Sequence, residues 1–222
     1  MTLPMIGQMG SYTRPSADEG DPLDLYVHGY VSSRIMNMSR AHISTSPIQE
    51  EKGLPVTVSA SHVDGLVLTL TPYSHNYNYR SALLFGYATV VSDISEKLYA
   101  MEIITNSVVP DRWANTRVPP TGAEMQSTSI LKINISTGSA KIRTGPTIPG
   151  DEKKDDTDNA ELVQKTWTGV IPVYPTLGHP LGGPFNVLEN PPEYLDQYLQ
   201  QSNDDAKDLA IQLSKKGAEK GP

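Results

Sequence analysis

A run of hydroxyl, amide, phenol and guanidinium side chains lies directly before the most apolar stretch of the chain. The run is Ser74–Ser81, and the apolar stretch that follows it is Ala82–Val91. Arginine offers a planar fork of donors to phosphate oxygens, serine and asparagine add donors and acceptors, and tyrosine offers an aromatic face with a polar tip. Such a cluster suits a flat, phosphorylated ligand. It is equally typical of an ordinary strand entry rich in turn-forming residues.

Two further segments carry the residue types of an anion site. Ser33 and Arg34 stand at the predicted start of a helix, where a hydroxyl, a guanidinium and free amide groups come together. Lys141 and Arg143 end a predicted strand, where they could bind a phosphate or form a solvated strand edge. Trp167 could stack on a ligand ring or pack in the core.

The remaining chemistry-bearing residues argue against most other kinds of site. No two histidines have the i, i+4 spacing of a helical zinc site, and without cysteine there is no thiolate ligand, thiolate nucleophile or disulfide framework. A Ser-His-Asp triad stays open, but no Gly-x-Ser-x-Gly segment supports it. His28 lies on a predicted strand, where a hydrogen-bonded core histidine is the commoner reading. Neither nucleotide-binding glycine pattern appears, so a nucleotide would bind on a barrel.

Length, composition and charge limit the classes of protein to which this chain can belong. The chain has 222 residues, of which 37% are hydrophobic and 19% are charged, as in a globular protein of one or two domains. The net charge of −7 argues against a nucleic-acid partner. No apolar run is long enough for a membrane span, and the N-terminus does not resemble a signal peptide. We therefore expect a soluble, cytoplasmic protein.

Alternating apolar residues and turn signals predict the elements that would position these side chains. An Asp64-Gly65 hairpin turn is expected between two of the strands, and a surface loop is expected over 144–158. The pattern is that of a mainly β, small antiparallel barrel with helical additions. The predicted strands are Leu23–Val31, Pro55–Ser61, Leu66–Thr71, Ala82–Val91, Ile130–Ile135 and Lys165–Pro172.

Three helices are predicted between and after the strands. Ser32 or Ser33 could cap a short first helix. Asp93 and Glu96 have capping-box spacing, in which Asp93 accepts a helix amide and Glu96 reaches back. Apolar spacing near the C-terminus predicts an amphipathic helix over 193–216 that packs on the barrel.

Taken together, these segments resemble the FMN-binding split-barrel family related to pyridoxamine 5′-phosphate oxidase. The similarity is greatest to its flavin-nucleotide-binding branch, which includes nitroimidazole-resistance-like proteins, and the tail suggests a fungal member. The matching stretches follow the family's order over about residues 23–172. They are Leu25–Gly29 with Ser33-Arg34, Val63–Leu68, His75–Gly86, Asp93 with Glu96-Lys97 and Ala100, Arg112-Trp113 with Arg117 and Pro119-Pro120, Glu124, Ser139–Pro146 and Trp167–Pro172.

The resemblance implies an antiparallel split barrel over 1–190, a helical tail over 191–222, and a homodimer with FMN in clefts between the subunits. It implies that Ser33 and Arg34 hold the phosphate. The other cofactor-binding residues that it implies are Tyr26, His28, Gly29, Asn78, Tyr79, Arg80, Ser81, Lys141, Arg143 and Trp167.

The implied activity is that of a flavin-dependent oxidoreductase on a small organic substrate, with His28, His75 and Tyr79 as candidate proton donors. Two alternatives remain open: a non-catalytic flavin- or haem-binding module, and a cofactor-free enzyme of secondary metabolism on the same barrel. The sequence departs from the family pattern at Asn76, where the family has serine. The family's N-terminal helix and first strand, which precede the stretch matching Leu3–Met5, are expected to be missing.

Overall fold

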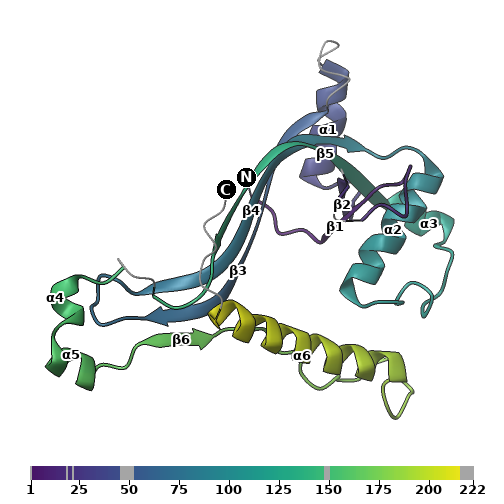
Figure 1. Ribbon diagram of the computed structural model, residues 1–222. Coiled ribbons are helices and arrows are strands. Elements are labelled where there is room, and N and C mark those ends of the chain that lie inside the picture. The colour runs from purple at the N-terminus through teal and green to yellow at the C-terminus, as the bar shows by residue number, and fades with distance from the viewer. Residues whose placement is uncertain (1, 19, 22, 46–52, 148–150, 216–222) are drawn as a thin grey trace. The chain divides into compact units, whose positions relative to one another are not determined.

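The computed structural model describes residues 2–18, 20–21, 23–45, 53–147 and 151–215 (Figure 1). The strands form one six-stranded sheet in the order β1-β2-β5-β4-β3-β6, and β1–β2, β2–β5 and β3–β6 are antiparallel pairs. The predicted mainly β, antiparallel fold class with added helices is thereby confirmed. The elements are β1 Gly7–Gly10, β2 Asp24–Tyr30, α1 Arg34–Thr45, β3 Leu54–Leu68, β4 Asn76–Val90, α2 Ile94–Val108, α3 Gly122–Ser127, β5 Thr128–Arg143, α4 Lys154–Thr157, α5 Ala160–Lys165, β6 Gly169–Pro172 and α6 Glu193–Lys215.

The chain divides into two compact units. The first unit comprises Met1–Val58 and Leu83–Ser139, and the second comprises Ser59–Ala82 and Ala140–Pro222. Strands β3, β4 and β5 each contribute residues to both units, and α6 belongs to the second. The division into a barrel domain over 1–190 and a tail over 191–222 stays a prediction.

Strand β2 carries buried side chains on both of its faces, because successive side chains of a strand point to opposite sides. Leu25 and Val27 pack in a cluster with Met36 of α1. Tyr26, on the opposite face, packs with Ala100 and Ile104 of α2, with Ile130 of β5 and with Val91, which directly follows β4. The core of the first unit therefore has two parts, one of which includes α1 and the other α2.

The start of α2 confirms half of the predicted capping box. Asp93 accepts a hydrogen bond from the Glu96 amide at 2.7 Å and so caps the helix. The Glu96 carboxylate does not reach back to the cap, because it binds side chains of β2 and β5 instead. A complete capping box, which the sequence analysis did not predict, opens α3 with Thr121 and Glu124.

The predicted hairpin turn at Asp64-Gly65 is wrong, because β3 continues through both residues. Asp64 is only 4% exposed, and its carboxylate accepts two hydrogen bonds from Arg80, each of 2.9 Å. Gly65 pairs with Pro172 of β6, and a Cβ there would lie 2.8 Å from a methyl group of Val170. The ion pair and the close strand neighbour hold this segment extended, and the chain turns over residues 72–74 instead.

Other elements differ from the prediction in extent. Strand β1 was not predicted, and it pairs with β2 at one edge of the sheet. The short first helix that was predicted after Ser32 or Ser33 is α1, which has 12 residues. The last predicted strand, Lys165–Pro172, is shortened to β6 because Lys165 ends α5. The predicted loop over 144–158 contains α4, and its residues 148–150 lie outside the described residues.

Helix α6 forms as predicted and packs within the second unit. The Gly145 amide donates to the Leu213 carbonyl at 2.7 Å, and Ala210 is 2% exposed. Asn203 exchanges two hydrogen bonds with the backbone of Leu177, at 2.7 and 3.0 Å. These contacts tie both halves of the helix to the preceding chain, so the helix is not a free tail.

Candidate functional site

The turn between β2 and α1 brings four of the predicted residues into one short segment of the first unit. The Ser33 amide donates to the Tyr30 carbonyl at 2.9 Å, and the Ser33 carbonyl accepts from the Asn37 amide at 3.0 Å, so Ser33 closes the turn and begins the helix. A Cβ on Gly29 would lie 3.6 Å from Ser33 Oγ. The same Cβ would lie 3.0 Å from Met36 Cε, so glycine at this position accommodates the close approach of the Met36 side chain.

Two polar groups in this turn lack partners among the residues that the structure describes. Ser33 Oγ is buried without a hydrogen bond, and a buried unpaired hydroxyl costs about 1–3 kcal/mol. The guanidinium of Arg34 is exposed at the first position of α1. A helix start favours anions through its free amides and its dipole. This turn therefore fits a phosphate group.

His28 also lies exposed on β2 rather than in the core.

Tyr26 belongs to a polar network inside the first unit. Its side chain is fully buried, and its hydroxyl donates to Glu96 Oε1 at 2.8 Å. Lys132 Nζ donates to the same oxygen at 2.9 Å and lies 3.3 Å from a carboxylate oxygen of Asp24. Burial, and then the hydrogen bond to Glu96, raise the pKa of the Tyr26 phenol above its usual value. The Tyr26 side chain therefore has a structural role in this unit.

The same network favours the charged ammonium form of Lys132. Burial lowers the pKa of its ammonium group, but the hydrogen bond and charge of Glu96 and the charge of Asp24 outweigh burial, so that the pKa is raised. The sequence analysis did not find this network, because Glu96 is 70 residues from Tyr26 and 36 residues from Lys132. No local spacing signals such a contact.

The second unit holds the other predicted cofactor residues, and two of their cations are paired with carboxylates. Arg80 binds Asp64 through two hydrogen bonds. Arg143 donates to Asn78 Oδ1 at 2.8 Å and lies 3.2 Å from Asp151. Asn78 is fully buried. These pairs fix the strand ends and compensate the charges of both guanidinium groups.

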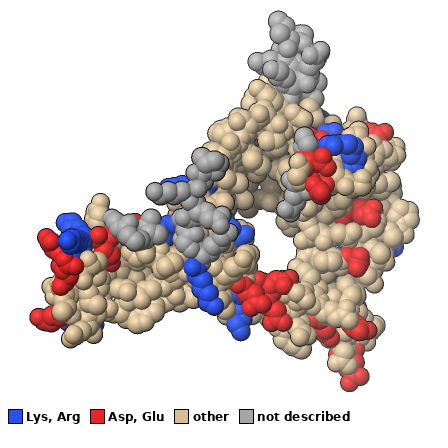
Figure 2. Space-filling model, viewed as in Figure 1, with Lys and Arg blue, Asp and Glu red and all other residues tan. Residues whose placement is uncertain are grey.

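Lys141 lies beside an aromatic ring instead of a carboxylate. Its ammonium nitrogen is 5.6 Å from the centroid of the Tyr79 ring, which is a cation–π distance. Its backbone carbonyl accepts from Ser81 Oγ at 3.0 Å. Among the described residues, Lys141 and Arg34 are thus the two predicted site cations without an ion pair. On the face shown in Figure 2, most of the surface is uncharged, and basic and acidic side chains lie beside one another in several places.

The structure also places the last two predicted residues. His75 Nδ1 lies 3.1 Å from the amide and 2.8 Å from the hydroxyl of Thr69, so the ring is held at the turn between β3 and β4. Trp167 is 64% exposed, so the core-packing alternative for it is wrong. Its ring covers Gly169, whose Cβ would lie 2.8 Å from it.

Within the residues that the structure describes, no group of three or more histidine and acidic side chains is arranged to hold a metal ion. No helix there is both long enough and apolar enough to cross a membrane.

Comparison with known proteins identifies the family. The family model described as pyridoxamine 5′-phosphate oxidase matches residues 11–142, which is more than half of the chain. The protein therefore belongs to this family, as its sequence resemblance implied. Among curated proteins none matches the chain.

Two solved structures share both the fold and part of the sequence. The flavocytochrome Anf3 from Azotobacter vinelandii is 27% identical, with a TM-score of 0.62, over 82% of this chain and 74% of that one. The FAD and haem binding protein from Mycobacterium smegmatis is 26% identical, with a TM-score of 0.63, over 79% of this chain and 77% of that one. A Bacteroides thetaiotaomicron protein assigned to 5-nitroimidazole antibiotic resistance matches at 16% identity and a TM-score of 0.41, over 62% of this chain and 66% of that one, which carries no argument about function.

The buried network predicts a loss of stability at alkaline pH. The usual pKa values of tyrosine and lysine are 10.0 and 10.5, and those of Tyr26 and Lys132 are raised in the folded chain. Above about pH 10 the unfolded chain releases these protons while the folded chain retains them, so the free energy of unfolding falls as pH rises.

Replacing Tyr26 by phenylalanine should therefore change both stability and its pH dependence. We expect Tyr26→Phe to lower the free energy of unfolding by about 1–2 kcal/mol at neutral pH, because the hydrogen bond is lost. Above about pH 10 the free energy of unfolding of this variant should fall less steeply with pH than that of the wild type. Urea unfolding across this pH range measures both effects. Tyr73→Phe, at a position 92% exposed, is the matched control. Equal pH slopes for Tyr26→Phe and the wild type would contradict the assignment.

Proposed function

We propose that this protein binds a flavin nucleotide, FMN, and acts as an oxidoreductase on a small organic substrate. The observation that carries the proposal is the turn at Ser33 and Arg34. It combines a buried hydroxyl without a partner among the described residues, an unpaired guanidinium and a helix start. FMN has a dianionic phosphate, which these groups would neutralise. Membership of the pyridoxamine 5′-phosphate oxidase family supports this ligand.

The similar structures support a flavin on this fold, since one is a flavocytochrome and the other binds FAD and haem. When bound, FMN would supply the redox chemistry, and the protein would supply binding and orientation. In the first unit, Ser33 and Arg34 would hold the phosphate, with His28 and Gly29 beside the cofactor. FMN would lie in a cleft between two subunits of the homodimer, for which the further proposed contacts are Asn78, Tyr79, Arg80, Ser81, Lys141, Arg143 and Trp167.

The candidate proton donors differ in how firmly they are held. His75 is fixed through Nδ1 by Thr69, which leaves Nε2 as the nitrogen that can hold or release a proton toward a substrate. The exposed imidazole of His28 has no hydrogen bond within the described residues. The phenol of Tyr79 lies beside Lys141. Histidine and tyrosine side chains can both serve as general acids or bases.

The phosphate turn is tested by two substitutions. We expect Arg34→Ala to weaken FMN binding by about 10- to 100-fold, because one charge-assisted contact is worth about 1.5–3 kcal/mol. Ser33→Ala should weaken it by about fivefold, because it removes a neutral donor worth about 1 kcal/mol. Titration of the apoprotein, followed by flavin fluorescence, measures both. Arg14→Ala removes an exposed arginine that pairs with Asp21 and should leave the affinity unchanged. Wild-type affinity in both site variants would remove this turn from the site.

The oxidoreductase activity is tested by reduction of the bound flavin. We expect anaerobic NADH or NADPH to bleach the flavin absorbance of the loaded protein, and a small organic acceptor to restore it. If neither donor bleaches stoichiometrically bound FMN, the protein is a flavin-binding module instead. If the protein is colourless and gains no flavin on incubation, the cofactor-free enzyme is supported.

Haem is the second candidate ligand. The names of both similar structures include it or a cytochrome, and haem needs an axial ligand such as histidine. His28 and His62 are both exposed, without hydrogen bonds to the described residues. The absorbance spectrum of the purified protein distinguishes haem, flavin and neither in one measurement.

We propose that the working form is a homodimer. In the second unit, Leu181, Phe185 and Val187 are 91%, 96% and 94% exposed, and apolar side chains gathered in this way mark interaction surfaces. Sedimentation at micromolar concentration should show a species of twice the 24.2 kDa chain mass. A single species at the chain mass would contradict the proposal.

A further inference from the structure

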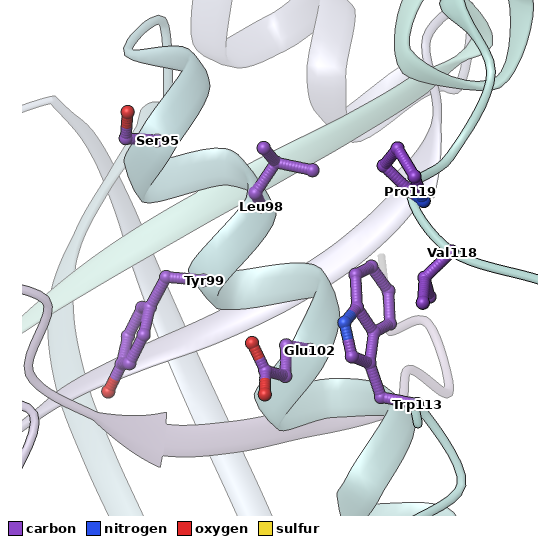
Figure 3. A pocket seen from close by; sticks show the side chains of 7 residues that line it. All are labelled: Ser95, Leu98, Tyr99, Glu102, Trp113, Val118 and Pro119. Carbon is purple, nitrogen blue, oxygen red and sulfur yellow. The ribbon is translucent and has the colours of Figure 1, made fainter. Parts of the chain in front are cut away.

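Helix α2 and the loop that follows it form a pocket of about 530 Å³ in the first unit (Figure 3). The indole of Trp113, from the loop, faces the side of the helix that carries Leu98 and Glu102. None of the residues that line the pocket belongs to the proposed flavin contacts. They include Leu98, Tyr99 and Glu102 of the helix and Trp113, Val118 and Pro119 of the loop.

The loop is held in place without a ligand. The Trp113 amide donates to Asn106 Oδ1 at 2.8 Å, which fixes the loop to the end of α2. Arg117 binds both oxygens of Glu124, at 2.5 and 2.7 Å, and donates to the Pro119 carbonyl at 3.1 Å. The hydrogen bond from Arg117, and then those from Thr121, lower the pKa of Glu124 to about 2. The Glu124 carboxylate is therefore ionised at ordinary pH values and available to Arg117. A preformed pocket of this size is typical of small-molecule sites.

The lining selects for one kind of ligand. Its walls are mainly apolar and aromatic, and a flat ring can stack on the Trp113 indole. Glu102 is the one carboxylate among the lining residues, and it has no hydrogen bond or ion pair within the described residues. A carboxylate and an indole that line the same pocket can both attract a cation, the first through its charge and the second through the cation–π interaction. The same carboxylate disfavours phosphates and other anions.

We propose that this pocket is a second small-molecule site and that it takes a flat aromatic cation, such as an aryl amidine. The ring would lie between Trp113 and the apolar side of α2, and the cationic group would bind Glu102. The site is independent of the flavin proposal, because it shares no residue with it.

The experiment compares two probes of nearly equal shape, benzamidine, which is a cation, and benzamide, which is neutral. Isothermal titration of the full-length protein should give saturable binding of one benzamidine per chain, with benzamide weaker. Trp113 and Trp167 are the two tryptophans of the chain, so in Trp167→Phe the fluorescence of Trp113 alone reports on the pocket. That fluorescence should change with the same saturation curve.

Substitution at Glu102 isolates the charge. Glu102→Gln should weaken the binding of benzamidine by about tenfold, as expected for one charge-assisted contact. The affinity for benzamide should be unchanged. Trp113→Ala should weaken both probes, while Glu189→Gln, which removes an exposed carboxylate outside the pocket, should affect neither. Non-saturable benzamidine binding, or equal benzamidine affinity in Glu102→Gln and the wild type, would overturn the proposal even if Trp113→Ala failed to fold.

Discussion

One carboxylate, that of Glu96, joins helix α2 to two neighbouring strands of the first unit. Its Oε1 atom accepts hydrogen bonds from Tyr26 of β2 and from Lys132 of β5. Moving a carboxylate out of water costs several kcal/mol unless good partners replace the solvent. Helix α2 is therefore held at the place where Tyr26 and Lys132 can satisfy Glu96; if the helix moves, Tyr26 loses this acceptor and Lys132 keeps only Asp24.

The position of α2 determines what its other side chains do. Tyr99 packs edge-on against Tyr26, with ring centroids 5.8 Å apart, and its hydroxyl accepts from the Ser11 amide at 3.0 Å, next to β1. Leu98 then faces the loop that carries Trp113 and Pro119, and Glu102 lines the same pocket. The pocket beside α2 and the strand that bears His28 and Gly29 are thus both set by the same buried contact.

The sequence predicted features with local causes and missed those with distant ones. The Asp93 cap depends on an amide three residues away, so its spacing was a sufficient signal. The Glu96 side chain was assigned to the same cap, because its contacts with β2 and β5 have no local trace. Asp64-Gly65 has the composition of a hairpin turn. The ion pair with Arg80 and the pairing with β6 override that preference, and both require the fold to be known.

The same distinction applies to the candidate site. The sequence correctly placed Ser33 and Arg34 at a helix start, since that is a local property. The sequence could not show which of the cations form ion pairs with carboxylates. Arg80 and Arg143 are paired with Asp64 and Asp151, whereas Arg34 and Lys141 have no such pairing among the described residues. Family membership depends on the order of many weak motifs, which the sequence does contain.

Strand β3 has a consequence for the solubility of the protein. Within the described residues, β6 pairs only with its last four, Gly65–Leu68, so the earlier part of β3 has an open edge. An open edge is a template for strand addition between molecules, which leads to aggregation. Pro55 lacks an amide hydrogen for such a ladder, and Thr57 and Ser59 present polar side chains to solvent while Val56 and Val58 face the core. The exposed edge therefore carries its own protection against fibrillar self-association.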